Sequence, residues 1–215
     1  MVAGLFAVIY TNPMKFLWPS GGKHNFYGTL AAPNMKGIPV EIVNGGLWAA
    51  DIGCLDGPSY VKRLDWNSLF DWLQLMRPYV DKCLFIAGGD VVANAFDTYT
   101  AYEELGHYFS GFPVAYVAQN GAEDLTIPIS CAAVFVGGDT EWKLSSQAVD
   151  VIKRAQNLGK HVHIGRVNWY RRYKAFEVLS GSDRFTCDGT RIRYGRDKAV
   201  QDWKAYERQK PLITI

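Results

Sequence analysis

Residues 83–90 have the sequence Cys83-Leu84-Phe85-Ile86-Ala87-Gly88-Gly89-Asp90, a short apolar run that ends in two glycines and a carboxylate. The run has no alternation of apolar and polar residues, which is typical of a parallel strand buried on both faces. A second apolar run, Ala132–Val136, ends in the same way, with Gly137-Gly138-Asp139. The two stretches predict parallel strands with small and polar residues at their carboxyl ends.

Similar runs occur along most of the chain, separated by segments with helical periodicity. The predicted strands are Ile38–Val43, Cys83–Ala87, Pro113–Ala118, Ala132–Val136, His161–Arg166 and Phe185–Cys187. The predicted helices are Asn67–Met76, Ala95–Phe109, a segment from about Trp142 to Leu158 that Thr140 caps and Gly159 closes, and Trp169–Leu179. The apolar run Val2–Tyr10 has no positive segment before it, so it indicates another strand and not a signal peptide.

Alternating strands and helices predict a parallel sheet, either closed into a barrel or open and doubly wound. Each of the six predicted strands is followed by a small and polar group, as on the C-terminal rim of a barrel. An open sheet would concentrate such residues at one switch point. We therefore predict an α/β fold, a compact (β/α)8 TIM-type barrel formed by one domain over residues 1–215. Because 215 residues is short for this fold, one strand or helix could be missing or irregular.

The composition suits one intracellular domain. Hydrophobic residues make up 48% of the chain, enough for a substantial core. Four cysteines lie far apart without a CxxC pair, which favours a reducing compartment over a disulfide scaffold or a structural zinc site. No run approaches the roughly 18 apolar residues of a membrane span. We expect a cytoplasmic protein that does not contact membranes.

The charge is distributed unevenly. Residues 153–215 hold 15 Lys and Arg against 6 Asp and Glu. Because the whole chain has 23 basic and 21 acidic residues, residues 1–152 hold 8 and 15. Such a basic segment predicts a polyanionic partner, with an ordinary solvated surface as the alternative. The candidate phosphate contacts are Arg171, Arg172, Lys174, Arg191, Arg193 and Arg196.

Few residues on the predicted rim could act as nucleophiles. The sequence has no GxSxG elbow, P-loop or GxGxxG motif, and its four histidines lack HExxH spacing, so we expect neither a metal nor a cofactor. What remains are carboxylates at strand ends, Asp90 and Asp188, with Asp139 and Glu141 nearby. A pair of carboxylates is the usual equipment for breaking a glycosidic bond. A single carboxylate at such a position could equally cap a helix.

The order of these motifs resembles the queuine tRNA-ribosyltransferase superfamily. More closely, three stretches resemble the short phage DNA 7-deazaguanine transglycosylases (DpdA type), over roughly residues 14–195: Gly21-Gly22-Lys23-His24, residues 137–145 and residues 162–168. The resemblance implies a glycosyltransferase that exchanges guanine in DNA for a free 7-deazaguanine base, such as 7-cyano-7-deazaguanine. The exchange would pass through a covalent Asp–deoxyribose intermediate.

The resemblance also implies roles for individual residues. It makes Asp188 the nucleophile and Asp90 the carboxylate that recognises the guanine-type base, with Gln119 and the backbone of Gly137 and Gly138 beside that base. The remaining substrate-binding candidates are Asn44, Gly45, Gly46, Trp142, His163, Arg166 and Asn168. For Trp142 and His163, an ordinary place in the core is an open alternative.

Two departures from the superfamily keep other functions open. The tRNA enzymes have an Asp directly before their Ser-Gly-Gly, whereas Val43 precedes Asn44 here, so the acid/base carboxylate is absent or replaced by Asp51 or another group. Only 27 residues follow Asp188, without the Cys-rich zinc subdomain, which favours DNA over tRNA. A tRNA-guanine transglycosylase, a non-catalytic nucleic-acid-binding barrel and, more remotely, a phosphosugar-metabolising barrel are the alternatives.

Overall fold

The computed structural model describes residues 17–18, 28–35, 37–55, 65–167, 176 and 184–189. Eight strands form one sheet, and every neighbouring pair in it is parallel. They are β1 (Leu17–Trp18), β2 (Gly28–Ala31), β3 (Trp48–Asp51), β5 (Cys83–Ala87), β7 (Val114–Ala118), β8 (Ala133–Val136), β9 (His161–Ile164) and β10 (Phe185–Cys187). A separate parallel pair joins β4 (Cys54–Leu55) to β6 (Asp90–Val91).

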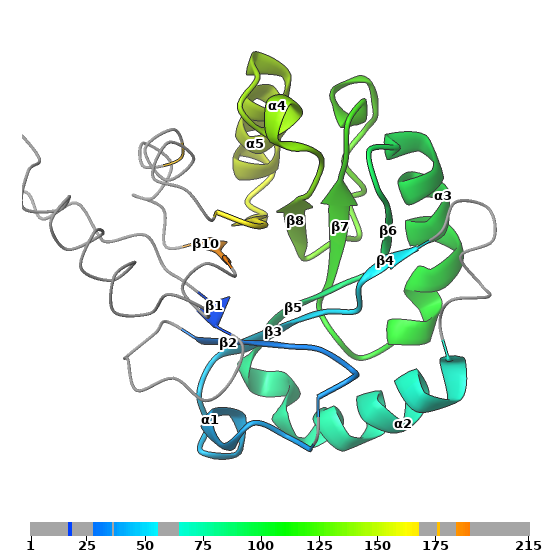
Figure 1. Cartoon of the computed structure of the whole chain (residues 1–215), viewed down its shortest axis with the longest axis vertical. Coiled ribbons are helices and arrows are strands. Elements are labelled where there is room, and N and C mark those ends of the chain that lie inside the picture. Colours follow the sequence, from blue (N-terminus) through cyan, green and yellow to red (C-terminus); the bar gives the residue numbers. More distant parts are fainter. Residues whose placement is uncertain are drawn as a thin grey trace, which may run out of the picture.

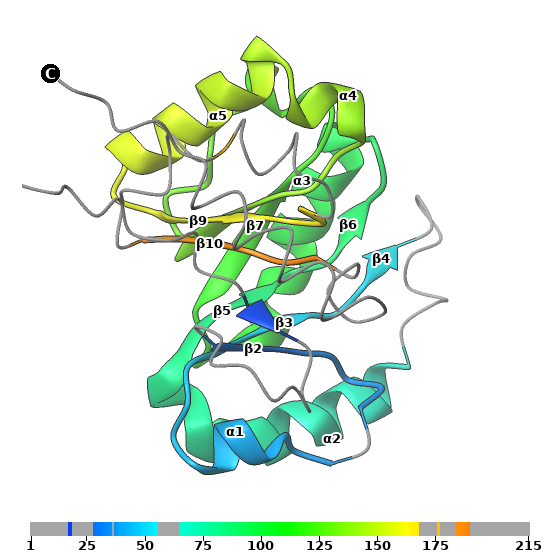
Figure 2. The same cartoon turned by 60° about the vertical axis from the view of Figure 1, so that its left-hand side comes forward.

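The strands of the large sheet are hydrogen bonded in the order in which they occur along the chain. A doubly wound sheet reverses its order at a switch point, and no reversal occurs among the described strands. The sheet also curls, so that its edge strands β1 and β10 turn toward each other (Figures 1 and 2). The architecture is therefore an α/β fold with a curled parallel sheet that forms part of a barrel.

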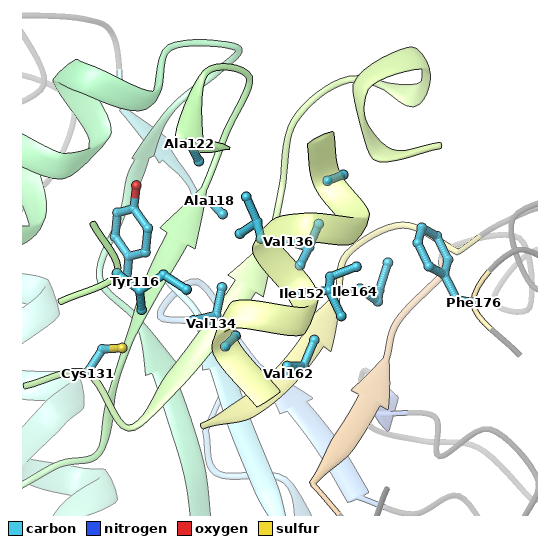
Figure 3. Close-up of a cluster of buried hydrophobic side chains, with 14 of the residues drawn as sticks. Tyr116, Ala118, Ala122, Cys131, Val134, Val136, Ile152, Val162, Ile164 and Phe176 are labelled. Carbon is cyan, nitrogen blue, oxygen red and sulfur yellow. The ribbon is translucent and has the colours of Figure 1, made fainter. Parts of the chain in front are cut away.

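Helices lie against the outer face of this sheet (Figure 1). The α-helices are α1 (Val40–Val43), α2 (Trp66–Met76), α3 (Ala95–Leu105), α4 (Thr140–Lys143) and α5 (Ser146–Asn157), and the 3-10 helices are η2 (Arg77–Lys82), η3 (Gly106–Phe109) and η4 (Ala122–Asp124). Helix α5 begins where the Ser145 side chain accepts a hydrogen bond from the Ala148 N–H. Its apolar face, which includes Ile152, covers β8 and β9 (Figure 3).

Successive side chains of each strand point to opposite faces, and this alternation separates two core layers. On β8, Val134 and Val136 join the outer layer beneath the helices, whereas Ala133 and Phe135 join the inner layer. The inner layer contains Leu17, Ala49, Phe85, Ala87, Ala115, Val117, Ala133 and Phe135. Burial of a side chain such as Phe85 contributes roughly 1.5–3 kcal/mol. Small alanines on neighbouring strands leave room inside the curl for the two phenylalanines.

Most of the predicted elements are confirmed. Strands β5 and β10 have the predicted bounds, and the strands predicted at 113–118, 132–136 and 161–166 differ from β7, β8 and β9 by one or two residues. Helices were correctly expected at α2 and at α3 with η3. The single helix predicted from about Trp142 to Leu158 is instead divided into α4 and α5, because Ser145 caps a new helix.

The prediction of a strand at Ile38–Val43 is wrong. Helix α1 occupies Val40–Val43, with Pro39 at its N-cap, and it exposes Val40 and Val43 while burying Ile42. Asn44 is the C-cap of this helix, and Gly45 follows with a φ of +83°. Strand β3 starts only at Trp48, so Asn44, Gly45 and Gly46 precede it. They lie at the opposite end of the sheet from the rim, and their predicted rim position is wrong.

Two predicted segments, the strand Val2–Tyr10 and the helix Trp169–Leu179 apart from Phe176, lie outside the described residues. Phe176 itself is buried in the outer layer (Figure 3). In the part of the chain that the structure describes, no helix combines the length and the apolar character needed to cross a membrane.

Candidate active site

The carboxyl ends of β3, β9 and β10 bring four polar residues together. Asp188 follows β10 and is 8% exposed. Its Oδ1 accepts a hydrogen bond from the backbone N–H of Arg166 at 2.8 Å, and its Oδ2 lies 3.1 Å from Nε2 of His163. Asp51, the last residue of β3, interacts electrostatically with Asp188, His163 and Arg166. We call these four residues the Asp188 cluster.

The turn after β9 aims its N–H at Asp188 through an unusual backbone conformation. Arg166 has a φ of +58°, a left-handed conformation that costs a non-glycine residue about 1–2 kcal/mol. The preceding Gly165 cannot carry a side chain, because a Cβ there would lie 2.6 Å from Cε1 of Phe135. Lys143, only 2% exposed, donates from Nζ to the Gly165 carbonyl at 2.9 Å. Lys143 is thus a buried support of this turn and not a surface lysine.

Asp51 lies in an environment that favours its protonated form. The Gly53 N–H donates to its Oδ1 at 2.9 Å. The side chain keeps some contact with solvent, but surrounding protein atoms enclose it, and this burial raises the pKa of Asp51. The charge of Asp188 also raises that pKa, whereas the Gly53 N–H, His163 and Arg166 act in the opposite direction. A carboxyl group of this kind can hold or release a proton beside Asp188.

From the sequence, Asp51 was a candidate only as a replacement for the acid/base carboxylate that is absent before Asn44. The structure places Asp51 at the end of β3 (Trp48–Asp51), with Ile52-Gly53 directly after it. A carboxylate close after a strand, with a glycine nearby, is the feature that also identified Asp90 and Asp188 as candidates. Asp51 could have been found by the same criterion, had the strand been predicted correctly.

A second group of polar residues connects the ends of β7 and β8 to the short strand β6. The Gln119 side chain donates from Nε2 to Asp90 Oδ2. Its Oε1 accepts from the N–H groups of Gly138 at 2.7 Å and Ala93 at 3.0 Å. Gln119 and Asp90 are both buried. We call Asp90, Gln119 and Gly138 the Gln119 bridge; in it, both ends of one amide join separate loops and hold Asp90 in place.

The two glycines after β8 allow this close packing. A Cβ at Gly137 would lie 2.5 Å from Nε2 of Gln119, and one at Gly138 would lie 2.5 Å from Cε3 of Trp142. Gly138 also has a φ of +69°. Trp142 belongs to the outer core layer and donates from Nε1 to Glu123 Oε2 at 2.9 Å. These contacts favour a core position for Trp142, the alternative that the sequence left open.

Asp139 at the same rim is a helix cap. Its Oδ1 accepts from the Trp142 N–H at 2.8 Å, and its Oδ2 accepts from Asn120 Nδ2 at 2.7 Å. The hydrogen bond from Trp142, followed by that from Asn120, lowers the pKa of this exposed carboxyl. The N-cap of α4 is therefore Asp139 and not the predicted Thr140.

The predicted phosphate contacts cannot be located, because Arg171, Arg172, Lys174, Arg191, Arg193 and Arg196 lie outside the described residues, as does Asn168. Two basic residues of the 153–215 segment that are described support loops. Arg154 donates to the carbonyls of Ala122, Glu123 and Leu125. Lys160 donates to those of Ile129 and Cys131.

No family model matches the chain, and no curated protein matches it either. Within the described ranges, no group of three His, Cys, Asp or Glu side chains is arranged to hold a metal ion. The chemistry of the site therefore has to be inferred from the Asp188 cluster and the Gln119 bridge.

Proposed function

We propose that this chain is a DNA-guanine transglycosylase, a pentosyltransferase that replaces guanine in DNA with a 7-deazaguanine such as 7-cyano-7-deazaguanine. The observation that carries the proposal is the pair of carboxyl groups in the Asp188 cluster. Asp188 has a hydrogen-bond partner at each oxygen, and burial raises the pKa of the neighbouring Asp51. A carboxylate nucleophile beside a carboxylic acid is the arrangement that glycosyl transfer with a covalent intermediate requires.

In the first step, Asp188 attacks the anomeric carbon of a deoxyguanosine that has been flipped out of the stack, at a cost of a few kcal/mol. A bond forms between a carboxylate oxygen and C1′, and the bond from C1′ to the guanine ring nitrogen breaks. Protonated Asp51 supplies the proton that the departing base gains. Neutral guanine leaves, and an Asp188–deoxyribose ester remains.

In the second step, the ring nitrogen of a free 7-deazaguanine attacks the same carbon. The bond between Asp188 and C1′ breaks, which returns the Asp188 carboxylate. Asp51, now ionised, takes the proton that the incoming base loses. Both carboxyl groups end the cycle as they began it, so the exchange needs no redox or nucleotide cofactor.

The Gln119 bridge supports recognition of the base. Asp90 provides a carboxylate acceptor, which suits the amino and amide N–H groups that guanine and 7-deazaguanine share. Gln119 ties Asp90 to the loop after β8 and limits its movement. A base that lacks the matching donors would forgo hydrogen bonds to Asp90, at a cost of about 1–3 kcal/mol per missing bond. The same carboxylate could thus recognise both the departing and the arriving base.

Two further features belong to the proposal. Pairing of β1 with β10 would close the eight strands of the large sheet into a (β/α)8-type barrel, which is the usual scaffold for an active site at strand C-termini. The basic residues beyond position 166 would bind the phosphates of DNA. With six to ten phosphate contacts, affinity should fall roughly 10³- to 10⁵-fold between about 50 and 200 mM salt.

The decisive experiment is to trap the covalent intermediate. Incubation of the protein with guanine-containing DNA, without free base, should give an adduct that resists denaturation, and added 7-deazaguanine should release it with the new base in the DNA. Asp188→Asn should form no adduct and still bind DNA. Asp139→Asn is the matched control, because an asparagine can cap α4 as the aspartate does, and it should react like the wild type.

The same assay separates the alternatives. Adduct formation with tRNA but not with DNA would replace the proposal with a tRNA-guanine transglycosylase. If the wild-type protein binds DNA, forms no adduct with either nucleic acid and exchanges no labelled base, the chain is a non-catalytic nucleic-acid-binding barrel.

A further inference from the structure

A chain of three hydrogen bonds leads from Asp188 into the interior of the curled sheet. His161 and His163 alternate with Val162 and Ile164 on β9 and therefore share its inner face with Thr186 of β10, which pairs with His163. Oγ1 of Thr186 lies 2.8 Å from Nε2 of His161 and 2.8 Å from Nδ1 of His163. Nε2 of His163 lies 3.1 Å from Asp188 Oδ2.

The chain runs through an apolar environment. His163 and Thr186 are fully buried, and the rings of Phe135 and Phe85 lie 4.7 and 5.0 Å from the His163 ring, centroid to centroid. Two carboxyl groups interact with His163: Asp188 at the rim end of the chain of hydrogen bonds, and Asp51 of β3. Polar groups buried in this way are costly unless each finds a partner.

The donors and acceptors can be matched in only one direction while both histidines are neutral and Asp188 is ionised. The carboxylate oxygen Oδ2 needs a donor, so His163 carries its proton on Nε2. Its bare Nδ1 must then accept the Thr186 hydroxyl proton. The oxygen of Thr186 is left to accept, and Nε2–H of His161 is the donor that faces it. Every bond therefore points toward Asp188.

We propose that His161, Thr186 and His163 are positioning residues that act as one relay, in which the direction of the hydrogen bonds holds the Asp188 carboxylate in the orientation for attack. The direction of the relay follows from the charge of Asp188 and from the Arg166 N–H. Its catalytic consequence rests on the proposed transglycosylase function, whereas the tautomers of the two histidines do not.

The relay should reverse when Asp188 becomes an amide. In Asp188→Asn the backbone N–H of Arg166 still requires an acceptor, so the amide oxygen takes that place and the NH2 group faces His163. Nε2 of His163 must then accept, and its proton moves to Nδ1. That proton is donated to Thr186, and the hydroxyl of Thr186 turns to donate to Nε2 of His161. One substitution at the rim thus changes the tautomer of His161 inside the sheet.

Nitrogen-15 NMR of histidine-labelled protein tests this directly. In the wild type we expect His161 and His163 as Nε2–H tautomers, and in Asp188→Asn we expect both as Nδ1–H. In Asp188→Asn combined with Thr186→Val, His163 should still switch while His161 should not follow it. The relay would be overturned if His163 of the wild type were the Nδ1–H tautomer. It would also be overturned if the tautomer of His163 were the same in the wild type and in Asp188→Asn.

A matched pair of variants tests the catalytic role. Thr186→Val keeps the shape and removes the hydroxyl, whereas Thr186→Ser keeps the hydroxyl. Formation of the Asp188–DNA adduct in a single turnover should slow about 10- to 100-fold in Thr186→Val, the scale on which outer hydrogen-bond partners act, and should recover in Thr186→Ser. Equal rates in the two variants would refute the positioning role.

Failure of the relay and failure of the proposed function give different results. Suppose that neither the wild type nor any variant forms an adduct, but the histidine tautomers switch as expected. The transglycosylase proposal then fails and the relay stands. If the adduct forms and the tautomers do not switch, the reverse holds. Should Thr186→Val not fold, the comparison of the wild type with Asp188→Asn still decides the direction of the relay.

Discussion

The Asp188 cluster and the Gln119 bridge each hold a buried carboxylate at a strand end, but they do so in different ways. In the Asp188 cluster, ionisable groups face one another, so the charge of one residue changes the proton affinity of the next. In the Gln119 bridge, a neutral amide ties Asp90 to the Gly138 and Ala93 backbone. The first arrangement suits movement of protons and charge, and the second suits a fixed surface against which a base is recognised.

The substitution Asp51→Asn should have the largest effect on the rate of adduct formation and tests this contrast most directly. Loss of a group that transfers a proton should slow adduct formation about 10²- to 10⁴-fold, while affinity for the free base, measured by calorimetry, stays the same. In the wild type the rate should fall at high pH as Asp51 loses its proton, and this fall should be absent in the variant. A variant that reacts at the wild-type rate would remove Asp51 from the mechanism.

Asp51 should also affect stability in a pH-dependent way. Because burial raises its pKa above the ordinary value of 3.8, the native state keeps this proton at pH values where the unfolded chain has released it. The stabilising contribution is complete below about pH 3.8 and is lost as the pH rises through the raised pKa. Denaturant titrations at several pH values should show this decline in the wild type and not in Asp51→Asn.

Asp90→Asn should have a smaller effect and a different signature. The asparagine oxygen can still accept from Gln119, but the carboxylate that we propose to recognise the base is gone. Affinity for the free base should fall about 10- to 100-fold, the equivalent of one unpaired buried group. At saturating base the second step should proceed at nearly the wild-type rate. A loss of rate without a loss of affinity would mean that Asp90 takes part in the chemistry.

Gly138→Ala tests whether the Gln119 bridge depends on close packing. The new Cβ would meet Trp142, and the alanine would have to adopt a left-handed φ. The variant should therefore lose about 1–3 kcal/mol of unfolding free energy. Gly106→Ala is the matched control, because a Cβ there meets nothing within 4 Å. The control should be neutral or slightly stabilised, and equal losses in the two variants would contradict the packing argument.

Lys143→Met should produce the smallest change. It removes the donor to the Gly165 carbonyl and keeps most of the apolar stem, so we expect a loss of about 1 kcal/mol in unfolding free energy. The exposed Lys153 of α5 offers the control Lys153→Met, which should leave stability unchanged. Adduct formation should slow in Lys143→Met alone if the Gly165–Arg166 turn holds Asp188.

The fold could be predicted where local signals and tertiary structure agree. Strand β5 is a continuous apolar run that ends in Gly88-Gly89, and its bounds were correct. Strand β3, with the sequence Trp-Ala-Ala-Asp, was missed because alanine and aspartate are poor strand formers. A strand was predicted at residues 38–43 instead, because that segment is rich in β-branched residues. The contacts of β3 with β2 and β5, which override its weak propensity, are not visible in a local pattern.

The candidate site could be predicted in part for a related reason. Asp188 and Asp90 follow recognisable strands, so their place at the rim was expected. The partners of Asp188 depend on the register between β9 and β10, whose residues lie more than 20 positions apart in the sequence. That His161 and His163 share a face with Thr186, which connects them, follows from this register and was not predicted.

The strand order has a consequence for biosynthesis. Neighbouring strands of the large sheet are made one after another along the chain, apart from the small β4 and β6 strands, which form a pair of their own. A chain emerging from the ribosome can therefore add one strand at a time to an existing edge. The nucleophile candidate Asp188 follows the last strand in that order. A nascent chain would therefore hold a largely assembled sheet before it contained the residue that we propose as the nucleophile.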